Sequence, residues 1–167
     1  MEFELKTLSP EAVPRALEKA VRYRLLHEPG EAASICLDAL AVDGGNQEAL
    51  VTLLLALTDQ FEENGTMAVA EAQHWLEQIR DEYERAYYDG IIWERRARAR
   101  LRRGVPDAGS RAYDWLREAM ACYERAEASR PQGNDDALLR WNACARLIMR
   151  ERLMPAEEER GEPLLLE

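Results

Sequence analysis

The residues with the clearest capacity for chemistry are Glu71 and His74, which are spaced as metal ligands on a helix. A Glu-x-x-His pair places both side chains on one helix face, and helical bundles that bind two iron ions use two such pairs. The only other histidine, His27, has Arg24 three residues before it, so a second pair is missing. We therefore expect no metal site, and we expect His74 to be structural or exposed to solvent.

Other signatures of catalysis are missing from the sequence. It contains no glycine-rich phosphate loop and no His-Glu-x-x-His motif. The three cysteines, Cys36, Cys122 and Cys144, are odd in number and widely spaced, so no disulfide framework is expected and they should be small buried side chains. We predict no cofactor and no enzymatic activity; an enzyme would require distant carboxylates to converge on His74.

The densest cluster of one residue type is a group of arginines between residues 95 and 103. Guanidinium groups bind carboxylates and phosphates through paired hydrogen bonds. Two interpretations are open: a solvated helix face that pairs with acidic residues, or a binding surface. The cluster flanks the apolar residues Trp93, Ala97 and Leu101 and consists of Arg95, Arg96, Arg98, Arg100, Arg102 and Arg103.

The charge of the chain is unevenly distributed along its length. The net charge is −10. Residues 1–90 carry 7 Lys and Arg against 18 Asp and Glu, whereas residues 91–154 carry 14 against 9. An acidic chain is a poor nonspecific ligand for nucleic acid, so we expect no nucleic-acid partner and rank phosphate or RNA binding below protein binding.

Apolar residues recur at steps of three and four, without sustained alternation, which predicts an all-α fold of about seven helices. The first helix should begin near Pro10 and the last should end near Leu153. Between them, we expect breaks at Pro29-Gly30, Asp43-Gly44-Gly45-Asn46, Glu63-Asn64-Gly65, Asp89-Gly90, Gly104-Val105-Pro106-Asp107 and Arg130-Pro131-Gln132-Gly133.

The two ends of the chain bear on its location and on its domain boundaries. The N-terminus lacks the basic start and apolar run of a secretory signal, and no apolar run approaches about 18 residues. We expect a soluble cytoplasmic protein with no membrane partner, comprising a helical domain, residues 1–154, and an acidic flexible tail, residues 155–167. The tail could block a basic groove; an alternative origin of Leu166-Glu167 is the join to a purification tag.

Two segments of the chain share one pattern of small residues. Residues 31–44 parallel residues 118–131: an alanine, a larger residue four positions on, another alanine three later, and a helix-stopping residue five beyond. This pattern resembles the second helix of the tetratricopeptide repeat. Residues 13–46 fit best, because Ala20 and Tyr23 match the small and aromatic positions of the first helix of the repeat.

The other units resemble the repeat less closely. Residues 90–133 keep Trp93 and Ala97 at family positions but contain an insertion around residues 104–112, and residues 47–89 are longer than one repeat. The resemblance implies a short α-solenoid of three antiparallel helical hairpins and one terminal helix.

In this family, the first helices of the repeats line a groove that binds peptides or partner helices. The resemblance therefore implies an adaptor or scaffold whose partner is a protein or peptide. The arginines would favour an acidic segment of that partner. Leu17 and Val21 stand where one peptide-binding subset has lysine and asparagine, which argues against its way of holding a terminal carboxylate. The implied contact residues are Arg24, Val51, Thr52, Leu55, Arg95, Arg98, Arg102, Arg140 and Arg146, with Leu139 as an apolar neighbour.

The charge distribution leaves a second interpretation open. A structural subunit could form homo-oligomers if the acidic half of one molecule contacted the basic region of another. Salt-sensitive oligomerisation would favour this alternative over the adaptor.

Overall fold

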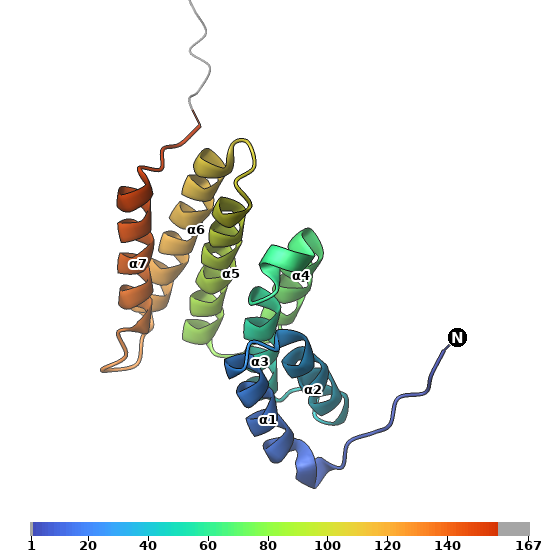
Figure 1. Cartoon of the computed structure of the whole chain (residues 1–167). Coiled ribbons are helices and arrows are strands. Elements are labelled where there is room, and N and C mark those ends of the chain that lie inside the picture. The colour runs from blue at the N-terminus through green and yellow to red at the C-terminus, as the bar shows by residue number, and fades with distance from the viewer. Residues whose placement is uncertain (1, 157–167) are drawn as a thin grey trace, which may run out of the picture.

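A computed structural model describes residues 2–156 and shows an all-α fold over that range (Figure 1). It has seven α-helices and no strand within the described residues, as the apolar spacing predicts. Of the predicted tail, residues 157–167 lie outside the described part. The elements are a 3₁₀ helix η1 (Pro10–Ala12) and the helices α1 (Val13–Leu25), α2 (Pro29–Val42), α3 (Gln47–Thr58), α4 (Phe61–Leu76), α5 (Glu82–Arg103), α6 (Ala108–Ala128) and α7 (Asp136–Glu151).

The helices form stacked antiparallel hairpins. Each helix packs against the next one along the chain, and α7 packs on α6 at the end of the stack (Figure 1). In addition, α1 contacts α3, and α3 contacts α5, so the first helices of successive hairpins lie side by side. No helix of the described residues is long and apolar enough to cross a membrane.

Two clusters of buried side chains form the core, and α5 belongs to both. The first cluster is built mainly by α1 to α4, and the second mainly by α6 and α7. From α5, Ile92 and Ala99 join the first cluster, whereas Ile91 and Ala97 join the second. A helix that is apolar on two sides packs against other helices on both sides. Helix α5 therefore lies between the two halves of the molecule and packs against both.

Polar caps fix the ends of the central helices. The Asn46 side chain accepts a hydrogen bond from the Ala49 amide at the start of α3 (2.9 Å), and Asp81 accepts one from Glu84 at the start of α5 (2.8 Å). These bonds satisfy amides that have no partner inside the helix. At the end of α5, Gly104 adopts a left-handed conformation (φ 59°), as glycine does at many helix C-termini.

The predicted break at Glu63-Asn64-Gly65 does interrupt the helical backbone, at Gly65, but the prediction that the third helix ends there is wrong. The third helix ends earlier, at Thr58, and α4 begins at Phe61. Gly65 kinks α4 without ending it, with φ 51° and ψ −127°, a conformation that favours glycine. The Glu-Asn-Gly sequence thus does mark an irregular backbone conformation, but α4 continues after it.

The predicted break at Asp89-Gly90 is also wrong, because both residues lie inside α5. Gly90 is there for a different reason: a Cβ atom at this position would lie 2.5 Å from Cε1 of Tyr123 on α6. The missing side chain lets the two longest helices approach closely. The break between α4 and α5 instead lies between Leu76 and Glu82.

We expect Gly90→Ala to lower the free energy of unfolding by about 1–3 kcal/mol, because the added methyl group must displace a packed ring. Tyr123 cannot yield easily, since it is fully buried and its hydroxyl donates a hydrogen bond of 2.7 Å to Glu94. Urea denaturation followed by circular dichroism measures the change.

Gly30→Ala is the matched control. Gly30 is exposed in the first turn of α2, and a Cβ there would meet nothing within 4 Å. Its replacement should be neutral or stabilise by up to about 1 kcal/mol. Equal destabilisation by the two substitutions would contradict the close-approach explanation of Gly90.

Candidate binding site

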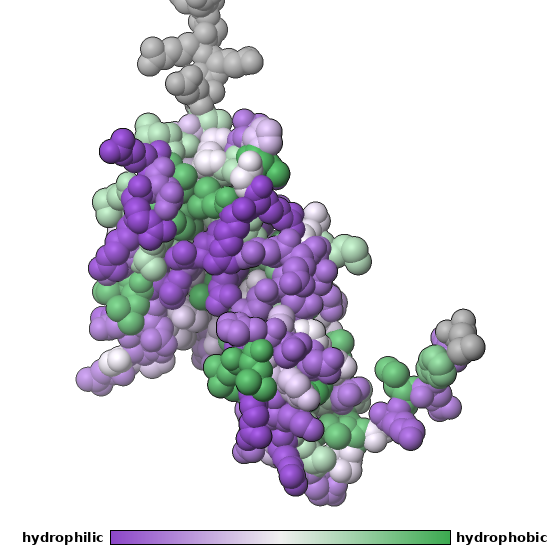
Figure 2. All heavy atoms as spheres, viewed as in Figure 1, coloured by the Kyte–Doolittle hydropathy of each residue, from purple (hydrophilic) through white to green (hydrophobic). Residues whose placement is uncertain are grey.

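A cleft of about 720 Å³ lies where α1, the α3–α4 junction, α5 and α7 meet, and we call it the central cleft. Hydrophilic residues cover the middle of the molecular face in Figure 2, where α5 lies in Figure 1. The cleft is lined by five of the arginines that the family resemblance implies for a groove, namely Arg24, Arg95, Arg98, Arg102 and Arg140.

Carboxylates at the α3–α4 junction hold three of these arginines in place. Asp59 accepts hydrogen bonds from Nε of Arg24 and from Nη1 of Arg95, both at 2.8 Å. Glu62 forms an ion pair with Arg102. The sequence analysis did not identify these acidic residues, because nothing in the linear pattern indicates that the end of α3 lies against α1 and α5.

The other two arginines bind a buried carboxylate, Glu94, which is 1% exposed. Nε of Arg98 donates to it at 2.9 Å and Nε of Arg140 at 3.1 Å, while a second nitrogen of Arg140 also contacts it. The Tyr123 hydroxyl completes the set at 2.7 Å. One carboxylate therefore joins α5, α6 and α7.

The charge state of Glu94 follows from two opposing effects on its pKa. Burial alone would raise the pKa of this carboxyl, but the hydrogen bonds and positive charge of Arg140, with further help from Tyr123 and Arg98, outweigh burial and lower it below the ordinary value of 4.5. The same contacts raise the pKa of Arg140. Glu94 is thus ionised in the folded protein and compensated on several sides.

The cleft arginines keep hydrogen-bonding capacity beyond these pairs. A guanidinium group has five N–H donors. In their ion pairs with the described carboxylates, Arg24 and Arg98 use Nε, and Arg95 uses one terminal nitrogen. Terminal N–H groups therefore remain for a ligand, and the local charge is far less positive than the arginines alone imply.

Five further residues expected in the groove lie elsewhere. Thr52 is buried, because α3 packs against α1, α2, α4 and α5, so its expected place on the groove surface is wrong. Val51 and Leu55 are partly buried against the first and second core clusters, respectively. Arg146 and Leu139 are exposed on α7 but do not line the central cleft.

The structure also places the residues considered for metal or thiol chemistry. His74 is exposed on α4, with its ring edge-on to Trp75 at 5.3 Å. Within residues 2–156, no three His, Cys, Asp or Glu side chains are grouped to hold a metal ion. All three cysteines are free and buried, as predicted, and burial raises the pKa of each thiol to about 12.

Comparison with known proteins adds no relative from which a role could be transferred. No protein-family model matches the chain, and neither the curated proteins nor the solved structures contain a significant match.

We expect Glu94→Gln to lower the free energy of unfolding at pH 7 by about 3 kcal/mol, because it removes one partner of a buried ion pair. The loss should depend on pH. Since the folded-state pKa of Glu94 is lowered, its stabilising contribution is complete above the ordinary value of 4.5 and disappears as the pH falls through the lower folded-state pKa.

Urea denaturation at several pH values, with native protein and variant side by side, tests this expectation. Glu118→Gln is the control, because Glu118 is exposed on α6; it should change stability by less than about 0.5 kcal/mol. A stability difference between native protein and Glu94→Gln that does not shrink on acidification would contradict the assigned charge state.

Proposed function

We propose that this chain is a tetratricopeptide-like adaptor that binds an acidic segment of a protein partner in the central cleft. The observation that carries the proposal is the convergence of arginines from α1, α5 and α7 on one cleft. The lateral contacts of α1 with α3 and of α3 with α5 support a repeat-like groove formed by first helices.

The pairing in the cleft explains how a partner would be selected. Asp59 and Glu62 hold Arg24, Arg95 and Arg102 in place, so little side-chain entropy is lost when a ligand carboxylate binds. A partner carboxylate would add to these contacts through the remaining N–H groups. Basic or neutral segments would leave those donors without acceptors, which disfavours them.

Exposed apolar residues beside the cleft suggest the second property of the partner. Leu25 and Leu26, which follow the cleft residue Arg24 along the chain, are 76% and 64% exposed. Val21, one turn before Leu25, is 40% exposed. The preferred segment would therefore combine acidic residues with aliphatic ones, since apolar contacts supply affinity and charged ones supply specificity.

Selection of binders from a random peptide library, followed by fluorescence anisotropy, tests the proposal. We expect enriched peptides to contain Asp or Glu beside aliphatic residues, and their affinity to fall as salt concentration rises. The double substitution Arg95→Gln and Arg102→Gln should weaken binding by about tenfold or more, because two charge-assisted contacts are lost.

The matched control carries Arg22→Gln and Arg117→Gln, which change the net charge equally but lie on exposed positions outside the cleft. Its affinity should equal that of the native protein. Peptides without acidic residues, or equal weakening by the two double variants, would contradict the proposal. Sedimentation of the unliganded protein across salt concentrations distinguishes the alternative, a self-associating subunit, which would form oligomers that dissociate in salt.

A further inference from the structure

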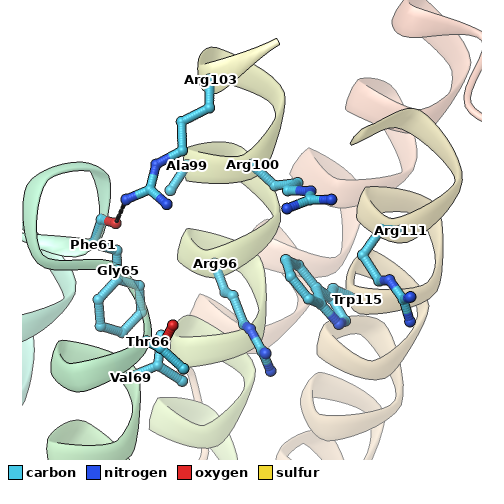
Figure 3. A pocket seen from close by; sticks show the side chains of 10 residues that line it. All are labelled: Phe61, Gly65, Thr66, Val69, Arg96, Ala99, Arg100, Arg103, Arg111 and Trp115. Carbon is cyan, nitrogen blue, oxygen red and sulfur yellow. Dashed lines mark hydrogen bonds between the residues drawn. The ribbon is translucent and has the colours of Figure 1, made fainter. Parts of the chain in front are cut away.

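A second cleft, of about 410 Å³, lies between α4, α5 and α6, and we call it the lateral cleft. It uses a different face of α5, with Arg96, Arg100 and Arg103 from that helix and Arg111 from α6. Figure 3 shows Arg96, Arg100 and Arg111 around Trp115, whereas Arg103 is turned towards the Phe61 carbonyl. The sequence analysis placed the α5 arginines in one cluster and did not divide them between two faces.

The lateral cleft differs from the central cleft in its charge balance. None of the residues that line it is Asp or Glu. Among the described residues, its four arginines form no ion pair, whereas every arginine of the central cleft does. The lateral cleft therefore gathers positive charge without a counterion from the described part of the chain.

Carbonyl groups hold Arg103 in place instead, and an aromatic ring holds Arg96. Arg103 donates to the carbonyl oxygens of Phe61 (3.0 Å) and Glu62 (3.2 Å), next to the kink in α4. The guanidinium carbon of Arg96 lies 4.0 Å from the ring centre of Trp115. Both kinds of contact orient a guanidinium group but leave its charge uncompensated.

Two observations indicate that this arrangement is costly without an anion. Nε of Arg100 is buried and has no hydrogen-bond acceptor among the described residues, which is unfavourable for a charged donor. Burial, and then the nearby charge of Arg111, lower the pKa of Arg96. A bound anion would relieve the repulsion between these guanidinium groups.

We propose that the lateral cleft binds the phosphate group of a small phosphorylated molecule, a function separate from the partner binding assigned to the central cleft. A phosphate group carries close to two negative charges and several acceptor oxygens, which suit several guanidinium groups better than one carboxylate does. The volume of the cleft is within the range of small-molecule sites, so it accommodates more than the phosphate group alone.

Isothermal titration calorimetry of the full chain tests the assignment, with inorganic phosphate, pyrophosphate, AMP, ATP and glucose 6-phosphate as probes and sodium chloride matched for ionic strength. We expect saturable binding of at least one phosphorylated probe, and the ranking of the probes would show which group accompanies the phosphate. Arg100→Gln and Arg111→Gln should each weaken binding by about tenfold or more.

Two controls separate this site from general electrostatic attraction and from the central cleft. Arg117→Gln removes an exposed arginine of α6, and Arg95→Gln removes one from the central cleft; neither should change the affinity for the phosphorylated probe. Thermal denaturation provides a second readout. Without an anion, Arg111→Gln should be at least as stable as the native protein because repulsion is reduced, but the probe should no longer stabilise it.

Three results would overturn the proposal. The first is the absence of saturable binding by every phosphorylated probe at millimolar concentration and low ionic strength. The second is equal weakening by Arg111→Gln and Arg117→Gln. The third is binding of a long polyanion such as poly(U) with no binding of the small probes, which would indicate a nucleic-acid surface instead.

Discussion

The burial of one carboxylate, that of Glu94, constrains the whole C-terminal half of the molecule. A charge removed from water is tolerated only when hydrogen bonds and opposite charges surround it. Here those partners come from α5, α6 and α7, so the three helices must keep one relative arrangement. Gly90 belongs to the same constraint, because the ring that packs against it is the ring whose hydroxyl reaches Glu94.

The arginines fall into groups according to the partners that hold them, and Glu94 holds one of these groups. Arg98 and Arg140 line the central cleft, yet they are tied to Glu94 and contribute to stability as well as to the charge of the surface. Arg95 and Arg102 pair with more exposed carboxylates and are better placed to exchange contacts with a ligand. The face of α5 towards α4 and α6 carries a third group, held by carbonyls and aromatic rings.

Sequence periodicity predicted the all-α architecture and the helix number, because these depend on which side of each helix is apolar. The five arginines of the central cleft followed instead from the resemblance to the tetratricopeptide repeat. Periodicity could not place the boundary between α4 and α5. In the sequence, Gly90 predicts the end of a helix. The presence of glycine there is explained only by the close approach of Tyr123 from another helix. Asp59 and Glu94 were missed for the same reason: an acidic residue gives no sign of its partner when that partner is distant in sequence. Thr52 was misplaced because its helix is covered on several sides.

The position of α5 between the two core clusters has a consequence for the cooperativity of unfolding. In repeat arrays, each unit gains stability mainly from its neighbours, and long arrays can lose their ends while the middle persists. In this protein, both groups of buried side chains include residues from one helix, α5. Melting of α5 would expose both groups at once. The two halves are therefore thermodynamically linked through α5, and a substitution that weakens the packing of this helix lowers the stability of both.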